Sequence, residues 1–154
     1  MYLRAKGAAG AREAAGWASP ILVILRHLET PPTMPRLLLA EDQIHPSIRV
    51  RVATHQADTV RQVQEAVARH AVVVVGMRGN PFVRRARKAL HGAAITHSYL
   101  EYGSYLSQWR VRNAIKLWCG WPTLPMVFVK GMLVGGAEDL EALLASGDLR
   151  RMLA

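Results

Sequence analysis

Few side chains in this chain of 154 residues could do redox or metal chemistry. The single cysteine, Cys119, allows neither a disulfide nor a cysteine-based metal site within one copy. The six histidines show no metal-ligand spacing, so we expect no metal site. A lone thiol fits a reducing compartment, and we therefore expect a cytoplasmic protein.

The charged side chains bear on possible partners. Lysine and arginine number 20 against 11 acidic residues, which gives a formal net charge of +9. The one basic cluster comprises Arg84, Arg85, Arg87 and Lys88. It is either a solvated helix face or a patch for an anion or a partner. No aromatic-rich basic strand accompanies it, so we expect no nucleic-acid partner. The apolar run at residues 21–25 is too short to span a bilayer, so we expect no membrane partner.

The elements that would position reactive side chains follow from periodicity and from glycine and proline. Residues 71–75 form an apolar run dominated by valine, which is typical of a central strand buried on both faces. Helices are predicted over residues 57–70, 81–91, 104–118 and 140–153, the last broken near Ser146-Gly147. Strands are predicted over residues 71–75, 94–102, 125–129 and 132–134, with Lys130-Gly131 as the turn of a hairpin. This order predicts an α/β fold in which a small mixed four-stranded sheet has helices on both faces.

Apolar positions at helical spacing predict which side chains enter the core. The predicted core positions of two helices are Val83, Ala86 and Leu90, and Leu106, Trp109, Ala114 and Leu117. The final helical region would contribute Leu140, Leu143, Leu144, Leu149 and Leu153.

The chain divides by composition into a leader, residues 1–40, and a domain, residues 41–154, with an extra helix at the domain's N-terminal side. The leader is basic and poor in acidic residues, which gives it some transit-peptide character, although it has little serine. The alternatives to a transit peptide are a disordered tail and a true start of the protein at Met34.

Four short motifs follow one another in the second half of the chain. Residues 121–131 are Trp-Pro-Thr-Leu-Pro-Met-Val-Phe-Val-Lys-Gly, and residues 135–139 are Gly-Gly-Ala-Glu-Asp. Upstream lie Met77-Arg78-Gly79 and, nine residues before Trp121, Arg112. These motifs and their spacing resemble the Trp-Pro-Thr-x-Pro, Gly-Gly-x-Asp and Met-Lys-Gly motifs of monothiol glutaredoxins. The match covers roughly residues 58–154 and implies a thioredoxin-like fold and a role in redox homeostasis.

The resemblance also implies a site for glutathione. Pro125 would follow a cis peptide bond, and the exposed backbone of Leu124 would hold the cysteinyl part of glutathione. The Gly-Gly turn would open a helix whose N-terminus favours one carboxylate, and two arginines would pair with the other. The implied glutathione-binding residues are Arg78, Arg112, Thr123, Leu124, Pro125, Gly136, Glu138 and Asp139.

The sequence departs from the family pattern at the nucleophile. Dithiol members have Cys-Pro-x-Cys between the first strand and its helix, where this chain has Asn80-Pro81-Phe82-Val83. If Met77-Arg78-Gly79 is aligned with the monothiol motif instead, the Cys-Gly-Phe-Ser loop of that motif is missing from this chain. Either alignment removes the thiolate needed for disulfide exchange, and it removes a ligand of a shared iron–sulfur cluster, so we expect no cluster.

Two hypotheses about function remain open from the sequence. The first is a non-catalytic module that binds glutathione or a partner protein. The second is a glutathione-dependent oxidoreductase or iron–sulfur carrier that uses Cys119 or a partner's cysteine. Cys119 would lie at the C-terminal end of a helix, which disfavours a thiolate, so an inert thiol is the simpler interpretation. The oligomeric state is left open.

Overall fold

The structure is a computed structural model that describes residues 36–154. Most of the predicted leader, residues 1–35, lies outside the described residues. Residues Glu41–Ala154 form one compact unit.

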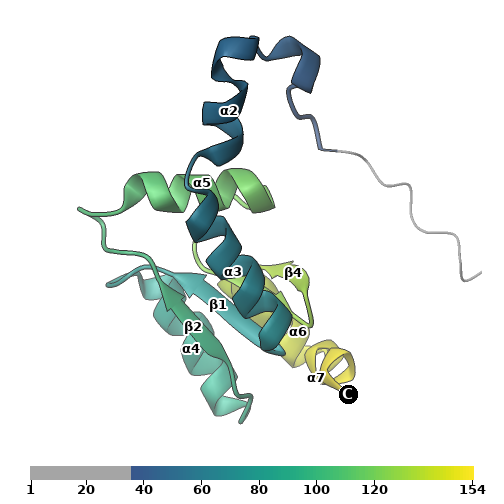
Figure 1. Cartoon of the computed structure of the whole chain (residues 1–154). Coiled ribbons are helices and arrows are strands. Elements are labelled where there is room, and N and C mark those ends of the chain that lie inside the picture. Colours follow the sequence, from purple (N-terminus) through teal and green to yellow (C-terminus); the bar gives the residue numbers. More distant parts are fainter. Residues whose placement is uncertain (1–35) are drawn as a thin grey trace, which may run out of the picture. The chain divides into compact units, whose positions relative to one another are not determined.

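Three helical elements precede the first strand, strands and helices then alternate up to a hairpin of two strands, and two helices follow the hairpin (Figure 1). Their bounds are η1 (Glu41–Gln43), α2 (Pro46–Thr54), α3 (Ala57–Arg69), β1 (Val72–Gly76), α4 (Pro81–Gly92), β2 (Ser98–Glu101), α5 (Trp109–Cys119), β3 (Met126–Val129), β4 (Met132–Gly135), α6 (Ala137–Ala145) and α7 (Asp148–Leu153). The break predicted near Ser146-Gly147 is confirmed, because it separates α6 from α7.

The sheet has four strands in the order β2-β1-β3-β4. β1 pairs in parallel with β2 and antiparallel with β3, and β3 pairs antiparallel with β4. Both residues of the β3–β4 turn, Lys130 and Gly131, have positive φ, as a tight hairpin turn requires. The predicted mixed sheet with a buried central strand is confirmed.

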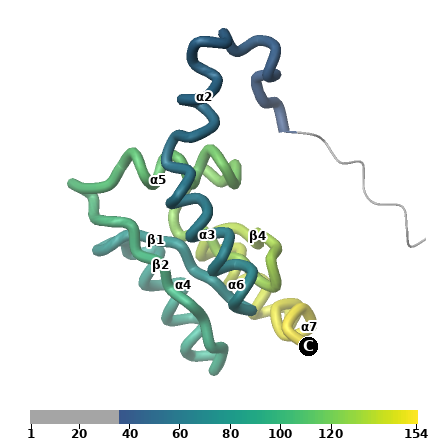
Figure 2. Tube along the Cα trace, viewed as in Figure 1, coloured from purple at the N-terminus to yellow at the C-terminus, as the bar shows by residue number. Residues whose placement is uncertain are grey.

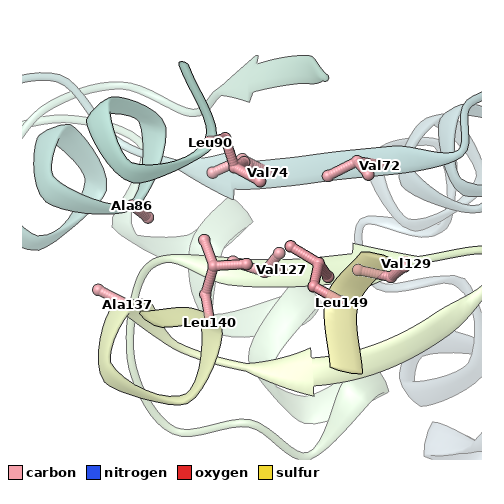
Figure 3. Close-up of a cluster of buried hydrophobic side chains, with 9 residues drawn as sticks. All are labelled: Val72, Val74, Ala86, Leu90, Val127, Val129, Ala137, Leu140 and Leu149. Atoms are coloured by element: carbon pink, nitrogen blue, oxygen red, sulfur yellow. The ribbon is translucent and has the colours of Figure 1, made fainter. Parts of the chain in front are cut away.

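Alternate side chains of β1 enter two separate cores, one on each face of the sheet. Val72 and Val74 face α4, α6 and α7 in the cluster shown in Figure 3. Val73 and Val75 face the opposite side, where α3 contributes Val63 and α5 contributes Ile115. Figure 2 shows the trace of α3 in front of the strands, with α4 and α6 behind them. The helices therefore cover both faces, as predicted.

The predicted helix over residues 104–118 is wrong in its first turn. α5 begins only at Trp109, because residues 103–108 form a loop that starts at Gly103 with φ 65°. The Ser107 hydroxyl accepts a hydrogen bond from the Ser104 N–H at 3.0 Å within this loop. The face of α5 that meets the sheet also differs from the predicted one. Ile115 is buried, whereas Leu117 is 74% exposed.

The core predicted for this helix is therefore mostly wrong. Ala114 is buried as predicted, but Leu106 and Trp109 are exposed along with Leu117. The predictions for α4 are confirmed, because Val83, Ala86 and Leu90 are all buried. The strand predicted over residues 94–102 shortens to β2, following Ala94 with its positive φ.

Candidate functional site

The connection from β1 to α4 places Asn80 at the edge of the sheet. Asn80 is the N-cap of α4, and its side-chain Oδ1 accepts hydrogen bonds from the N–H groups of Phe82 at 2.9 Å and Val83 at 3.1 Å. Pro81 follows at the first helical position, where its missing N–H costs little. The asparagine side chain thus takes two of the N–H groups that an anion at this helix terminus would use.

The segment before β3 reaches the same edge because β1 and β3 are antiparallel. Val75 pairs with Met126, so the residues after β1 and those before β3 come together. The Leu124–Pro125 peptide bond in this segment is cis, which confirms the expectation from the motif.

A groove runs along this edge and is formed by two hollows. One hollow of about 380 Å³ is lined by Met77, Asn80, Phe82, Trp109, Arg112, Asn113, Lys116, Pro122, Thr123 and Leu124. The other, of about 250 Å³, is lined by Phe82, Trp121, Thr123, Leu124, Pro125, Gly136, Ala137, Glu138 and Asp139. Phe82, Thr123 and Leu124 belong to both, so they form the middle of one continuous groove, which we call the edge groove.

Two cationic side chains of α5 line the hollow of about 380 Å³, which we call the first end of the edge groove. Arg112 is buried, and its Nη1 donates to the carbonyl oxygen of Tyr102 at 2.9 Å and to that of Ser107. Burial also raises the pKa of Tyr102. Lys116 follows one helical turn later. Arg112 therefore holds the loop before α5 as well as lining the groove.

The hollow of about 250 Å³, the second end of the edge groove, is lined by the residues that begin α6. Gly135 has φ 116°, a conformation open to glycine, and the Gly136 N–H donates to Asp139 Oδ2 at 2.8 Å. Glu138 lies 3.7 Å from the guanidinium of Arg85. This end combines helix N–H groups with carboxylates, so it presents both acceptors and donors to a ligand.

The buried indole N–H of Trp121 stands beside this end of the groove. Among side-chain polar atoms of residues 36–154 that are fully buried, Trp121 Nε1 is the one without a hydrogen-bond partner. An unpaired buried donor costs about 1–3 kcal/mol. The ring carbon Cζ2 comes 3.7 Å from where a side chain on Gly136 would begin, so Trp121 also limits the width of the groove.

Seven of the eight residues predicted to bind glutathione line the edge groove. The exception is Arg78, which is 78% exposed and pairs with Glu101 at 3.1 Å. Sequence reasoning missed Phe82, Trp109, Asn113 and Lys116 as lining residues. For Lys116 the signal was available, because its spacing of four from Arg112 puts both on one helix face.

Cys119 does not line the edge groove. It lines a different hollow with Trp118, Phe128 and Leu133. Its Sγ accepts the Trp121 N–H at 3.4 Å and lies 3.5 Å from Met126 Sδ. A group of three or more potential metal-ligating side chains is not found among residues 36–154, and none of the helices there is long and apolar enough to cross a bilayer.

Comparison with known proteins identifies the family. No family model matches the sequence. A glutaredoxin-like protein of Dictyostelium discoideum is 42% identical over 98 residues, which are 64% of this chain and 80% of the relative. The chain belongs to the glutaredoxin family. The mitochondrial monothiol glutaredoxin-5 of Schizosaccharomyces pombe is also similar, at 28% identity over 70% of this chain and 75% of its own.

Solved glutaredoxin structures confirm the thioredoxin-like fold. Oxidized glutaredoxin 2 from Chlamydomonas reinhardtii matches with a TM-score of 0.56 and 26% identity, over 64% of this chain and 92% of its own. The buckwheat glutaredoxin–glutathione complex matches with a TM-score of 0.57 and 20% identity, over 65% and 91% of the two chains. Within this family the present chain has its one cysteine, Cys119, outside the usual active-site position.

Proposed function

We propose that this glutaredoxin-family chain is a non-catalytic binding module whose edge groove holds glutathione or a partner protein that presents similar groups. One observation carries the proposal: Asn80 lines the edge groove at the start of α4, and its side chain caps that helix. We infer that Asn80 takes the place that a reactive thiol would have in a catalytic relative. The groove supplies binding without supplying a nucleophile.

The two ends of the groove suit the two charged ends of glutathione. Arg112 and Lys116 offer cationic donors to one carboxylate at the first end. At the second end, the start of α6 offers backbone N–H groups to the other carboxylate, and Asp139 offers an acceptor to the ammonium group. The buckwheat glutaredoxin of similar fold was solved as a glutathione complex, which supports the same ligand here.

We propose that catalysis is absent because the side chain of Asn80 is an amide and not a thiol. Disulfide exchange begins when a thiolate attacks a disulfide sulfur, and an amide does not perform that attack. The same thiolate would be a cluster ligand, so we also propose that no iron–sulfur cluster is held. Cys119 lies in another hollow and does not replace it.

Titration of the ¹⁵N-labelled full chain with reduced glutathione tests the proposal. We expect amide shifts at Leu124 and Glu138 with a dissociation constant of roughly 1 mM, which corresponds to about −4 kcal/mol. Lys116→Glu should weaken binding at least about fivefold, because it places a carboxylate beside a carboxylate. Lys88→Glu makes the same charge change on α4 outside the groove and should leave binding unchanged. No shift at Leu124 and Glu138 at millimolar glutathione refutes glutathione as the ligand.

We further propose a cytoplasmic location, which rests on the single thiol. Imaging of the full chain carrying a C-terminal fluorescent tag, in cells of its source, would test this. A tag that enters an organelle would contradict it.

A further inference from the structure

A further hollow among the described residues lies outside the edge groove. It has a volume of about 730 Å³ and lies where α2, α3 and α5 meet. Its lining residues are Arg51, Val52, Ala53, His55, Ala57, Val60, Arg61, Gln64, Ala114, Leu117 and Trp118. We call it the helical groove. It shares no lining residue with the edge groove.

The walls of the helical groove carry large apolar side chains that face solvent. Leu117 of α5 is 74% exposed, and Val52 of α2 is 53% exposed. The helical groove continues into the hollow of about 470 Å³ at Cys119, because Gln64 and Trp118 line both. An exposed apolar groove of this extent is unusual on a protein surface that contacts only water.

α2 points to a missing partner as well. This helix has nine residues and buries none of them, and Figure 1 shows it extending from the start of α3 away from the sheet. Isolated helices shorter than about 12–15 residues are marginal in water, so a helix like α2 draws its stability from packing. Burial of Val52 against a bound chain would supply that packing.

The charges around the helical groove indicate the chemistry of that partner. Arg51 and Arg61 line it, and no carboxylate does. Arg61 lies 3.6 Å from Asp58, whereas Arg51 forms no ion pair with any residue between 36 and 154. A second copy of this chain would bring another net charge of +9 to the same place, which disfavours self-association.

We propose that the helical groove is a docking site for an acidic amphipathic helix of a partner protein. An α-helix is about 10 Å across and lays its apolar face into a groove between helices, with its charged flanks toward the rim. An added strand would need a free sheet edge, and the lining contains no strand residue. An anionic membrane surface is the alternative that the vesicle experiment below tests.

A designed peptide tests this on the full chain. The probe is a fluorescein-labelled helix of about 18 residues, roughly five turns, with leucine along one face and glutamate on the others. We expect saturable binding by anisotropy and amide shifts at Val60, Gln64 and Leu117, with none at Leu124. The same peptide with lysine for each glutamate should bind at least about tenfold more weakly.

Paired variants locate the contact. Val52→Glu should weaken probe binding at least about tenfold, because it puts a carboxylate into an apolar contact. Val50→Glu is the matched control, since Val50 is also an exposed valine of α2 but does not line the helical groove. Leu117→Glu and the exposed Leu106→Glu, which lies outside the groove, form a second pair that should differ in the same way. All four sites are solvent-exposed, and circular dichroism should show that the variants stay folded.

Several outcomes overturn the proposal. Equal binding of the acidic and basic probes would show that the partner is not selected by its negative charge. Equal effects of Val52→Glu and Val50→Glu would show that the probe does not bind in the helical groove. A dimer by sedimentation that Leu117→Glu dissociates would assign the groove to a second copy. Binding to phosphatidylserine vesicles that Val52→Glu abolishes would assign it to a membrane. Glutathione titration reports on Leu124 instead, so its failure leaves this result unaffected.

Discussion

Placing a cysteine at position 80 should create a reactive thiol. The N–H groups of Phe82 and Val83 already point at the side chain of Asn80, at 2.9 and 3.1 Å from Oδ1. A thiolate in that place would accept from the same groups at the positive end of α4. A helix N-terminus favours an anion by up to about 2 kcal/mol in partly buried geometry. Since about 1.4 kcal/mol is a factor of ten, the thiolate-to-thiol ratio should rise roughly 30-fold over that of an exposed cysteine.

The assay is the pH dependence of iodoacetamide alkylation in a protein with one thiol, Asn80→Cys combined with Cys119→Ser. The control is Thr54→Cys in the same Cys119→Ser background, because Thr54 is exposed and ends α2. The pKa of the introduced thiol at position 80 should lie below that of the control. We also expect this variant to gain glutathione-dependent reduction of a glutathione mixed disulfide, because its thiolate can attack the glutathione sulfur and release the other thiol.

Two results would refute the reasoning. Alkylation midpoints that coincide in the two variants would show that the start of α4 is not arranged for an anion. A lowered pKa without any gain of activity would show that the edge groove does not bring glutathione to position 80, which would also count against the proposed ligand.

Two further predictions concern the folded state. Gly135→Ala should destabilise the protein by about 1–3 kcal/mol or more, because of its φ of 116° and because the new Cβ would lie 2.6 Å from Cγ of Asp139. Gly131→Ala is the control, since that site also has a positive φ but open space around it, and urea denaturation should show a smaller loss. The Arg85 hydrogen bonds and charge lower the pKa of Glu141 below its ordinary value of 4.5. The unfolded chain then binds more protons than the folded one, so this contribution to stability is present above that value and is lost as pH falls below it. In Glu141→Gln the decline of unfolding free energy below this pH should be shallower, and an unchanged decline would show that the ion pair does not contribute.

The core of the fold could be predicted from the sequence because its signals are local. Val72 to Val75 predict a strand buried on both faces, and Val83, Ala86 and Leu90 predict the inner face of α4. Asn80 at the junction of these elements is also evident from the sequence alone. Each of these positions depends on neighbours within one or two helical turns.

The sequence predictions fail at α5, which follows an irregular loop, and at α2, which does not pack into the core. The loop that begins at Gly103 delays the start of α5. Arg112 donates to the carbonyl oxygens of Tyr102, just before this loop, and of Ser107 within it. Leu117 is exposed because the face of α5 that carries Ile115 packs against the core instead. In α2 the apolar residues Ile48, Val50 and Val52 alternate with arginines, so the segment has no apolar face at helical spacing by which sequence analysis could find it. The helical groove went unforeseen for this reason.

The central claim is that this chain keeps the glutaredoxin groove without thiol catalysis. The most direct test is the rate at which the full native chain, in the presence of glutathione, reduces a glutathione mixed disulfide of a small thiol. The account predicts a rate equal to that of glutathione alone, both for the native chain and for Cys119→Ser. A higher rate in the native chain that Cys119→Ser abolishes would contradict it, and would make Cys119 a nucleophile.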